Sequence, residues 1–450
     1  MKKIKNLSEG NFLKLLFGFV AACFIIAAVC MPDRSDMFSG LWRIMTSTAK
    51  ISTNYFSVGG FAGTFLNMGL VTAIALLLFI VLKGTPNNVS TLAVLLTTGF
   101  CSWGINPINM IPSMLGVVLY GLVKKEKLGT LVNAMLFSTG IAPLISELLF
   151  RYPAVEYTGF SWPHLGVALA VGLAIGFFLP AGLAHSPKVH KGFDLYSAAL
   201  PIGMTAFLLN ATLFNTMGLK ASDLAAAGSM AVTSRMTVNI FCGSVFGLCV
   251  IFAFLLGCKP KDYWQLLKDP ALVTNFSSTY GNATFLMNMG VFGLFILGYY
   301  NLINAPFNGV TFGIIFCMLA TCNSGSHPGN VWPIMLGYFV ASAVCGWIAP
   351  LVGGKFAFTI NAQAICVGLC YANGLSPIAD KYGWRWGFLA AVLHYLLVTS
   401  VPTLHGGFCL YNGGFTAALI CLILVPELEK FSKTTEERWE RRLARKTAAK

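Results

Sequence analysis

The chain alternates between long apolar runs and short polar segments from end to end. Many runs are close to the 20 residues that a helix needs to cross a bilayer core of about 30 Å. The short alternating segments of an outer-membrane barrel do not appear. The pattern therefore predicts an all-α integral membrane protein with about 14 (12–14) transmembrane or re-entrant helices. The runs lie near residues 11–31, 59–82, 90–103, 106–123, 128–150, 162–183, 193–215, 236–257, 281–301, 309–323, 330–350, 356–376, 386–401 and 408–426.

Several phrases in the sequence occur twice. GINPINMIPSMLG (104–116) and GSHPGNVWPIMLG (325–337) share the pattern G-x-x-P-x-N-x-x-P-x-M-L-G, at a separation of 325 − 104 = 221 residues. TNYFSVGGFAGTFLNMG (53–69) and TNFSSTYGNATFLMNMG (274–290) have the same separation and share eight of seventeen positions. Matches in register at one separation indicate an internal repeat.

Two further pairs follow in the same order. PKVHKGFDLY (187–196) matches PTLHGGFCLY (402–411) at a separation of 402 − 187 = 215, and GIAP (140–143) echoes GLSP (374–377). We therefore predict two homologous halves, each with about seven apolar runs. The boundaries are residues 1–235 for the first transmembrane repeat, 236–432 for the second and 433–450 for a basic cytoplasmic tail.

Composition supports a membrane protein. The chain is 56% hydrophobic and 10% charged, whereas a soluble domain carries roughly 25% charged residues. The formal net charge is +14, but the basic residues lie at the termini and in short loops, where they meet anionic lipid headgroups. We therefore expect membrane lipids, and no nucleic acid, as partners. Most of the 13 cysteines lie in apolar runs, so we expect neither a metal site nor a disulfide framework.

Loop charge indicates how the halves are oriented. With both termini in the cytoplasm of a bacterial inner membrane, alternation places most basic loops inside, including Lys83, Lys124–Lys127 and Lys259–Lys268. The outer loops at 104–106, 302–308 and 402–407 have no Lys or Arg, and the loop at 32–58 is the main exception. Since seven crossings per half turn the second copy over, this multi-pass arrangement is an inverted repeat.

The runs at 90–103 and 309–323 leave this parity open. The first has about 14 residues, too few for an ordinary span. If these runs are re-entrant, each half crosses the membrane an even number of times. The halves would then be related by an axis along the membrane normal rather than one in the membrane plane.

The doubled phrase is the leading candidate for a solute site. Pro107, Pro112 and Pro328 each remove a backbone donor, so an unbroken helix is excluded in the first copy. Broken backbone at membrane depth is tolerated where protein or a water-filled cavity satisfies it, and paired breaks are typical of transporter sites. We assign substrate binding to a set of prolines and amides. The set is Asn67, Pro107, Asn109, Asn288, Pro328 and Asn330.

An alternative reading of these residues is structural. The phrase is also compatible with a tight loop that caps two short helices, with its asparagine as the N-cap. Asn67 and Asn288 lie within apolar runs, where an amide either joins two helices or binds solute. In the first reading, Asn109 and Asn330 face each other across the repeat axis, beside Asn67 and Asn288.

Ionisable and aromatic residues supply gate or proton-relay candidates. His190 and His405 precede apolar runs in the second repeated phrase, and Tyr196 and Tyr411 follow them. The alternative is an interfacial histidine with a tyrosine of the aromatic belt. Acids and histidines at membrane depth are functional candidates by default, and here they are Glu147, Asp194 and His394. Glu147 alternatively reaches the headgroups with Arg151.

Missing motifs narrow the class of function. The chain has no Walker loop, no H-E-x-x-H and no G-x-S-x-G, so we expect no cofactor, no ATP drive and no enzyme of these classes. We predict a transporter or channel for a small polar solute. A homo-oligomer is compatible with this prediction. The alternatives are a non-transporting scaffold and an intramembrane enzyme acting on a lipid-linked substrate. The enzyme would use His185, Lys188, His190 and Lys191.

The doubled phrases together resemble a family of bacterial membrane proteins known as a domain of unknown function. The segment LYNGGFTAALICLILVP (410–426) is similar to helices of urea transporters, which are also inverted repeats. The seven-plus-seven count is similar to nucleobase and sulfate transporters. These likenesses imply an inverted-repeat architecture with a central site near the bilayer midplane, and they imply no particular solute.

Overall fold

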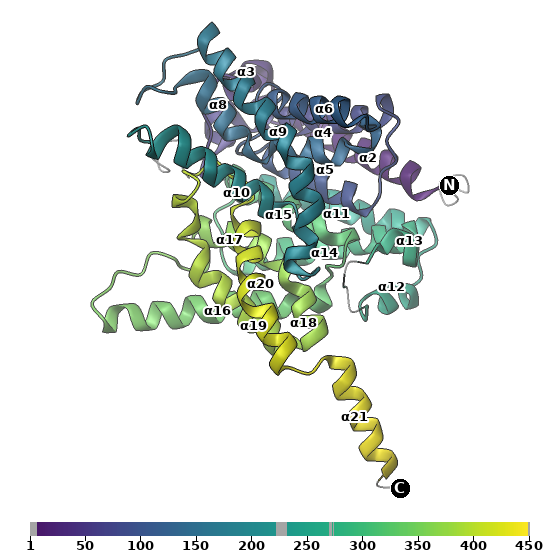
Figure 1. The fold of residues 1–450 in the computed structure, drawn as a ribbon. Helices are drawn as coiled ribbons and strands as arrows, with labels where there is room; N and C mark the ends of the chain where they lie inside the picture. The colour runs from purple at the N-terminus through teal and green to yellow at the C-terminus, as the bar shows by residue number, and fades with distance from the viewer. Residues whose placement is uncertain (1–6, 222–231, 270–271, 273, 449–450) are drawn as a thin grey trace.

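A computed structural model describes residues 7–221, 232–269, 272 and 274–448 of the 450-residue chain. Every regular element in these ranges is helical, which confirms the predicted all-α class (Figure 1). Seven helical stretches among the described residues are long and apolar enough to cross a membrane. They are α2 (Glu9–Cys30), α4 (Tyr55–Val81), the stretch Val132–Phe150, α9 (Trp162–His190), α11 (Arg235–Leu255), α14 (Asn282–Leu302) and α16 (Pro328–Leu351).

Shorter helices complete the fold of this multi-pass membrane protein. The stretch Val132–Phe150 consists of α7 (Val132–Ser138) and α8 (Ala142–Phe150), joined by a 3₁₀ turn. The other α-helices are α3 (Met37–Met45), α5 (Asn88–Phe100), α6 (Ile111–Lys124), α10 (Ala199–Asn210), α12 (Pro260–Leu266), α13 (Phe276–Tyr280), α15 (Gly309–Leu319), α17 (Gln363–Ala372), α18 (Ser376–Tyr382), α19 (Trp384–Val398), α20 (Asn412–Phe431) and α21 (Thr435–Ala448).

Helix packing follows the same order in the two parts of the chain. In the first part α2 packs on α4 and α6 packs on α9, whereas in the second α11 packs on α14 and α16 on α19. Figure 1 shows α3, α4 and α6 at one end of the molecule and α16, α18 and α19 toward the other, with α5 and α15 between them.

Repeated residues produce the same local breaks. Gly60 and Gly281, which occupy one position of the repeated phrase, have φ values of 75° and 84°. A residue with a Cβ is strained at such angles, so glycine permits a sharp break within the first two turns of α4 and immediately before α14. At the first break, the carboxylate of Asp33 accepts hydrogen bonds from the backbone of Phe61 and Ala62, at 2.8 and 3.1 Å.

Helices α5 and α15 begin at equivalent caps. Asn87 accepts a hydrogen bond from the backbone N of Ser90 at 3.1 Å, and Asn308 accepts one from Thr311 at 3.0 Å. Since 308 − 87 = 221, these caps have the separation of the repeated phrases. Each cap satisfies a backbone donor that a helix N-terminus leaves unpaired.

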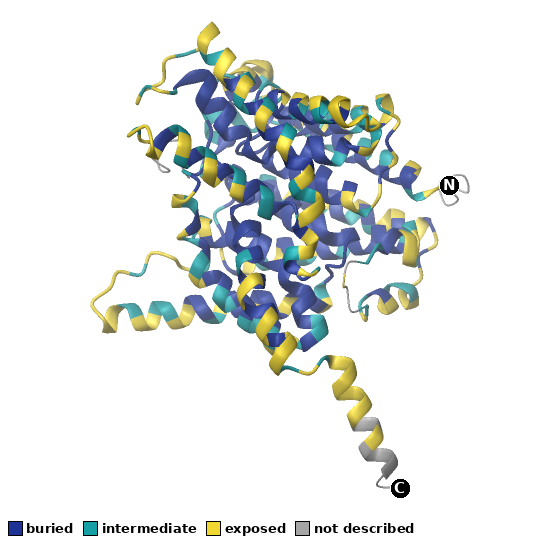
Figure 2. Ribbon diagram, viewed as in Figure 1, coloured by how far each residue is buried: buried dark blue, intermediate teal, exposed yellow. Residues whose placement is uncertain are grey.

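The centre of the molecule is the antiparallel pair α5 and α15. All residues of Ser90–Phe100 and Gly309–Leu319 are buried, within the dark core of Figure 2. At 1.5 Å per residue, helices of this length extend roughly 15–20 Å, short of the bilayer core. The prediction that the run at 90–103 is too short for an ordinary span agrees with the length of α5, and α15 is short as well.

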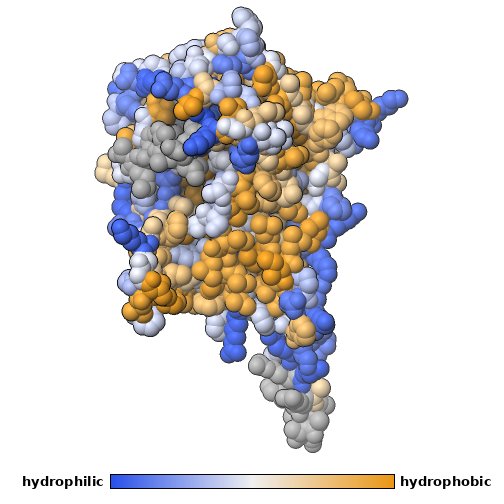
Figure 3. Space-filling model, turned by 60° about the vertical axis from the view of Figure 1, so that its left-hand side comes forward, coloured by the Kyte–Doolittle hydropathy of each residue, from blue (hydrophilic) through white to orange (hydrophobic). Residues whose placement is uncertain are grey.

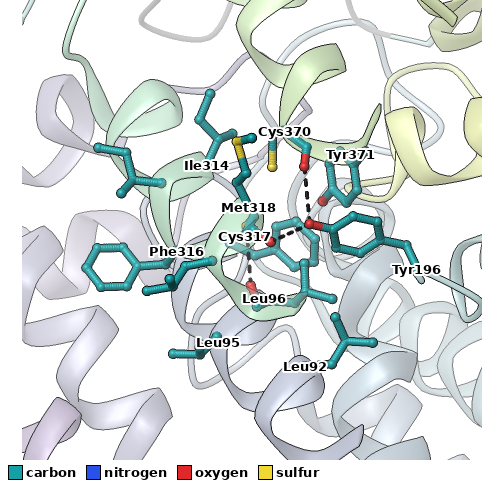
Figure 4. Close-up of a cluster of buried hydrophobic side chains, with 14 of the residues drawn as sticks. Leu92, Leu95, Leu96, Tyr196, Ile314, Phe316, Cys317, Met318, Cys370 and Tyr371 are labelled. Atoms are coloured by element: carbon teal, nitrogen blue, oxygen red, sulfur yellow. Dashed lines mark hydrogen bonds between the residues drawn. The ribbon is translucent and has the colours of Figure 1, made fainter. Parts of the chain in front are cut away.

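Contacts between α5 and α15 run in both directions. Ser102, just after α5, donates its hydroxyl to the carbonyl of Gly309 at 2.6 Å. Asn323, just after α15, donates its amide to the hydroxyl of Thr91 at 3.2 Å. At the crossing, the thiol of Cys317 lies 3.8 Å from the carbonyl of Leu96, a contact drawn in Figure 4. The end of each short helix thus lies beside the start of the other.

The outer surface is apolar over broad areas. Figure 3 shows such a surface on one side of the body, with more hydrophilic side chains along the projecting tail helix. Exposed large apolar side chains on the long helices are what a lipid-facing surface requires. They include Phe178 on α9, Ile240, Ile251 and Phe254 on α11, and Trp347, Ile348 and Leu351 on α16.

The backbones of α5 and α15 lie too close together at Gly313 to leave room for a side chain. A Cβ there would lie 2.3 Å from the carbonyl oxygen of Gly99 and 2.2 Å from the Ser102 hydroxyl. We expect Gly313→Ala to destabilise the protein by about 1–3 kcal/mol, because the paired backbones must separate. Thermal unfolding in detergent measures the loss.

Gly298→Ala in α14 is the matched control, because a Cβ at this position meets nothing within 4 Å. This variant should be neutral or slightly stabilising, since alanine is the better helix former. Equal melting temperatures for Gly313→Ala and the unsubstituted protein would contradict the close packing.

Candidate functional site

The backbone after α5 is held by two asparagine side chains. Asn67 on α4 donates its amide to the carbonyls of Cys101 and Ile105, at 2.7 and 2.8 Å. Asn109 donates to the carbonyl of Gly104 at 2.8 Å and to the hydroxyl of Ser146 at 2.9 Å. Both amides are buried. They therefore replace the helical hydrogen bonds that the chain gives up between α5 and α6.

The backbone after α15 is held in the same way. Asn288 on α14 donates to the carbonyls of Cys322 and Ser326, at 2.8 and 3.0 Å. These three residues lie 221 positions after Asn67, Cys101 and Ile105. Asn330 donates to the carbonyl of Gly325 at 2.9 Å, which again repeats the first half at the same separation.

The doubled phrase interrupts the helical backbone in both parts of the chain. The chain breaks at each copy, as predicted, with Pro107 in the loop before α6 and Pro328 as the first residue of α16. Asn109 and Asn330 accept hydrogen bonds from the backbone of Asn106 and His327, at 2.9 and 3.0 Å. Neither asparagine is the N-cap that the alternative reading expected, because Met110 and His327 hold that position in α6 and α16, and Asn330 is the third residue of α16, within its capping box. No side-chain hydrogen bond joins Asn109 to Asn330 in the described part of the protein. Helices α6 and α16 lie at opposite ends of Figure 1.

Several buried polar atoms near the breaks have no hydrogen-bond partner among the described residues. Burying such an atom unpaired costs about 1–3 kcal/mol, so it normally marks a place where water or a ligand binds. Two of these groups belong to the break after α5. The other three belong to the break after α15 or to the neighbouring helices α17 and α18. They are Asn67 Oδ1, Trp103 Nε1, Ser326 Oγ, Asn373 Oδ1 and Ser376 Oγ.

The second repeated phrase connects the two parts of the chain reciprocally. The backbone N of Leu195, before α10, donates to the carbonyl of Gly374 at 3.0 Å. The backbone N of Leu410, before α20, donates to the carbonyl of Gly140 at 2.9 Å. Each phrase therefore docks onto the turn between two short helices of the opposite part, α17–α18 or α7–α8. These turns are the GLSP and GIAP segments of the sequence.

A tyrosine follows each docking bond and packs against the same glycine. A Cβ on Gly374 would lie 2.6 Å from the ring of Tyr196, and one on Gly140 would lie 2.4 Å from the ring of Tyr411. Only glycine leaves room for these rings. This explains why each GxxP turn carries a glycine opposite a tyrosine.

The two tyrosine hydroxyls differ in their bonding. The hydroxyl of Tyr196 lies 2.8 and 3.1 Å from the carbonyls of Cys317 and Cys370, at the ends of α15 and α17 (Figure 4). The hydroxyl of Tyr411 is buried without a partner among the described residues. Equivalent side chains thus have different hydrogen-bonding states.

The histidines of this phrase brace the turn before each tyrosine. His190 Nδ1 accepts from the backbone N of Asp194 at 3.3 Å, and its Nε2 lies 2.8 Å from the Ser197 hydroxyl. His405 repeats this pattern with Cys409 at 3.3 Å and the Asn412 Oδ1 at 2.9 Å. Because Nδ1 accepts, the proton of each neutral ring lies on Nε2.

The third histidine candidate is also fully bonded. His394 Nδ1 lies 2.6 Å from the Tyr338 hydroxyl, and its Nε2 lies 2.8 Å from the carbonyl of Gly413. A carbonyl only accepts, so the ring proton is again on Nε2. His394 thereby ties α16, α19 and the start of α20 together.

The acidic candidates have different surroundings. Glu147 is buried and paired with Arg151, whose Nε lies 2.6 Å from its Oε1. The other carboxylate oxygen of Glu147, Oε2, is buried without a partner among the described residues. Asp194 accepts from the backbone N of Tyr196 at 2.9 Å, while its second oxygen, Oδ2, is buried without a partner among the described residues.

One acid was missed by the sequence analysis. Asp380 on α18 accepts a hydrogen bond from the amide of Asn330 at 2.9 Å. Its equivalent is Ser146, since 380 − 146 and 374 − 140 both equal 234. Extending the GIAP and GLSP alignment by three residues would have placed this acid opposite a serine. In the structure, each of the two is bonded to the repeated asparagine of its own part of the chain.

Comparison with known proteins gives a family. No curated protein and no solved structure matches the chain. A family model described as "Protein of unknown function (DUF1576)" matches residues 33–215 and 259–430. Because the two matched stretches cover well over half of the 450 residues, the chain belongs to this family.

Proposed function

We propose that the chain is a transporter or channel for a small polar solute. In this proposal, two inverted repeats form it, and the solute passes the breaks after α5 and α15. The observation that carries the proposal is the set of unpartnered buried polar atoms at these breaks and in the neighbouring α17–α18 turn, Asn67 Oδ1, Trp103 Nε1, Ser326 Oγ, Asn373 Oδ1 and Ser376 Oγ. Unpaired polar atoms destabilise a membrane core that has only a structural role. A polar solute or its water would supply the missing hydrogen bonds.

The repeat relation is supported by hydrogen bonds rather than by sequence alone. The bonds of Asn67 recur in Asn288, those of Asn109 in Asn330 and those of His190 in His405. The stretches that match the family model begin 259 − 33 = 226 residues apart and end 430 − 215 = 215 apart. These separations are close to those of the repeated phrases, 221 and 215.

Within the proposed site, the asparagines and prolines have different roles. The breaks are held open by two asparagines and two prolines. Asn109 and Asn330 use their amides for hydrogen bonds within the protein, and Pro107 and Pro328 have no backbone N–H to donate. Asn67 contacts the break with its amide and leaves Oδ1 available to solute. Asn288 is its counterpart, with Oδ1 lying 3.4 Å from the Tyr263 hydroxyl.

The alternative of an intramembrane enzyme has weaker support. Its proposed cluster included His190 and Lys191, but His190 is bonded to Ser197 and Lys191 pairs with Glu429. These contacts give both residues a structural explanation. We therefore propose transport rather than catalysis, in a bacterial inner membrane with both termini in the cytoplasm.

We propose Tyr196 and Tyr411 as a pair of gates. Transporters with inverted repeats alternate when one repeat moves relative to the other about a fixed site. The bonded hydroxyl of Tyr196 and the unbonded hydroxyl of Tyr411 fit one such state. In the opposite state, Tyr411 would reach the carbonyls of Leu96 and Leu136, which are the counterparts of Cys317 and Cys370.

Uptake into proteoliposomes tests the solute pathway through Ser326. A panel of small polar solutes identifies one that the unsubstituted protein transports or that raises its melting temperature. We expect Ser326→Ala to reduce flux of that solute several-fold, because a hydrogen bond to solute or water contributes about 1 kcal/mol. Its melting temperature should not fall, since the hydroxyl bonds no described group.

Ser39→Ala is the control, because Ser39 is exposed and its hydroxyl bonds only within its own helix region. The pathway would be wrong if Ser326→Ala transported the solute as fast as this control. A panel in which no solute shows protein-dependent flux would argue against transport itself.

The proposed gates predict that the same substitution lowers thermal stability at one tyrosine and not at the other. Tyr411→Phe should reduce flux without lowering the melting temperature, because its hydroxyl is used only in the other state. Tyr196→Phe should lower the melting temperature as well, since it loses a buried bond of about 1 kcal/mol. Flux and thermal unfolding of both variants are measured together, and normal flux in Tyr411→Phe would rule out its gate role.

Cysteine labelling tests the inverted orientation at Ser57 and Ser278. These serines are equivalent, since 278 − 57 = 221, and are partly or fully exposed. In a Cys30→Ser background, a membrane-impermeant maleimide should label Ser57→Cys on intact cells. It should label Ser278→Cys only after permeabilisation. Labelling of both from one side would mean that the halves are parallel rather than inverted.

A further inference from the structure

A surface cavity of about 730 Å³ lies where the tail helix α21 meets α18 and α19. Thr435, at the start of α21, donates its hydroxyl to the carbonyls of Asp380 and Lys381, at 3.0 and 2.9 Å. Arg438 also donates to the carbonyl of Tyr382. The tail helix is therefore joined to the end of α18 beside the cavity, although most of it projects from the body in Figure 1.

The cavity combines positive charge with tryptophan. Its lining contains two arginines and three of the chain's nine tryptophans, and no Asp or Glu. A fourth tryptophan, Trp332, lies with its ring centroid 5.9 Å from that of Trp384. The complete lining is Tyr382, Gly383, Trp384, Arg385, Trp386, Leu389, Thr435, Arg438 and Trp439.

The two arginines have donors available for an anion. Arg385 is exposed and makes no side-chain hydrogen bond to the described part of the protein, and its guanidinium lies 5.7 Å from the ring centroid of Trp384. Arg438 uses one terminal nitrogen for Tyr382 and Thr435. A guanidinium offers up to five N–H donors in a planar fork, which matches a phosphate group.

The tryptophans indicate where such a phosphate would come from. Trp384 and Trp439 are 49% and 61% exposed, which is unfavourable in water but suits the boundary between headgroups and acyl chains. Trp386 and Leu389 extend the lining along α19, away from the charged end. A free phosphate ion would use the arginines alone, whereas a phospholipid would use both parts of the lining.

We propose that this cavity binds an anionic phospholipid. Arg385 and Arg438 hold the headgroup phosphate, and the upper acyl chain lies over Trp386 and Leu389. The bound lipid would fasten α21 to the end of α18, where Asp380 bonds Asn330 of the doubled phrase. This site does not depend on the proposed transport function.

Lipid binding to the purified, delipidated full chain in detergent tests the proposal. We expect phosphatidylglycerol to bind, and phosphatidylcholine to bind at least tenfold more weakly. Arg385→Gln should weaken phosphatidylglycerol binding about tenfold. This variant preserves the contacts of Thr435 and Arg438 that hold α21, so a loss is not explained by release of the helix.

Arg441→Gln is the matched control, because Arg441 is exposed on α21 and does not line the cavity. It should bind phosphatidylglycerol like the unsubstituted protein. An unaffected Arg385→Gln, or an equal loss in both variants, would overturn the site. Inorganic phosphate should not displace the lipid at equal concentration, and full displacement would mean a site for free phosphate instead.

Discussion

The architecture depends on satisfying backbone polar groups at the buried ends of two short helices. Where α5 and α15 stop, several carbonyls lose their helical partners at a depth where water is scarce. Amides from neighbouring helices take their place, above all those of Asn67 and Asn288, which each bridge two carbonyls. Without these amides, the breaks would be too costly for a membrane core, and the short helices could not pair.

Sequence reasoning reached much of this arrangement because its signals are local. Glycine, proline and asparagine in a fixed order are sufficient to predict broken segments, and the length of 90–103 was sufficient to mark a short helix. It could not predict the partners of Asn109 and Asn330, because Ser146 and Asp380 are distant in sequence. The exposed pocket beside α21 depends on how the tail docks, which no periodicity describes.

The histidine and tyrosine phrase illustrates a second limit. Its repetition attracted a functional interpretation, yet both ring nitrogens of His190 and of His405 are occupied by nearby groups of the same turn. The contact that matters over distance is instead made by backbone, through Leu195 and Leu410. Every residue has the same backbone groups, so the sequence does not show which of them form hydrogen bonds. The only sequence signal of this contact is the glycine that packs against each tyrosine.

The reciprocal docking of these phrases also has a consequence for biosynthesis. Gly140 emerges from the ribosome about 270 residues before Leu410, whose N–H its carbonyl accepts in the finished protein. The first half therefore enters the membrane with the turn between α7 and α8 incomplete. That turn is completed only once the segment that contains Leu410 has been synthesised. The docking bond between Leu410 and Gly140 is therefore a late contact in the assembly of the protein, made after α9 to α19 have been translated.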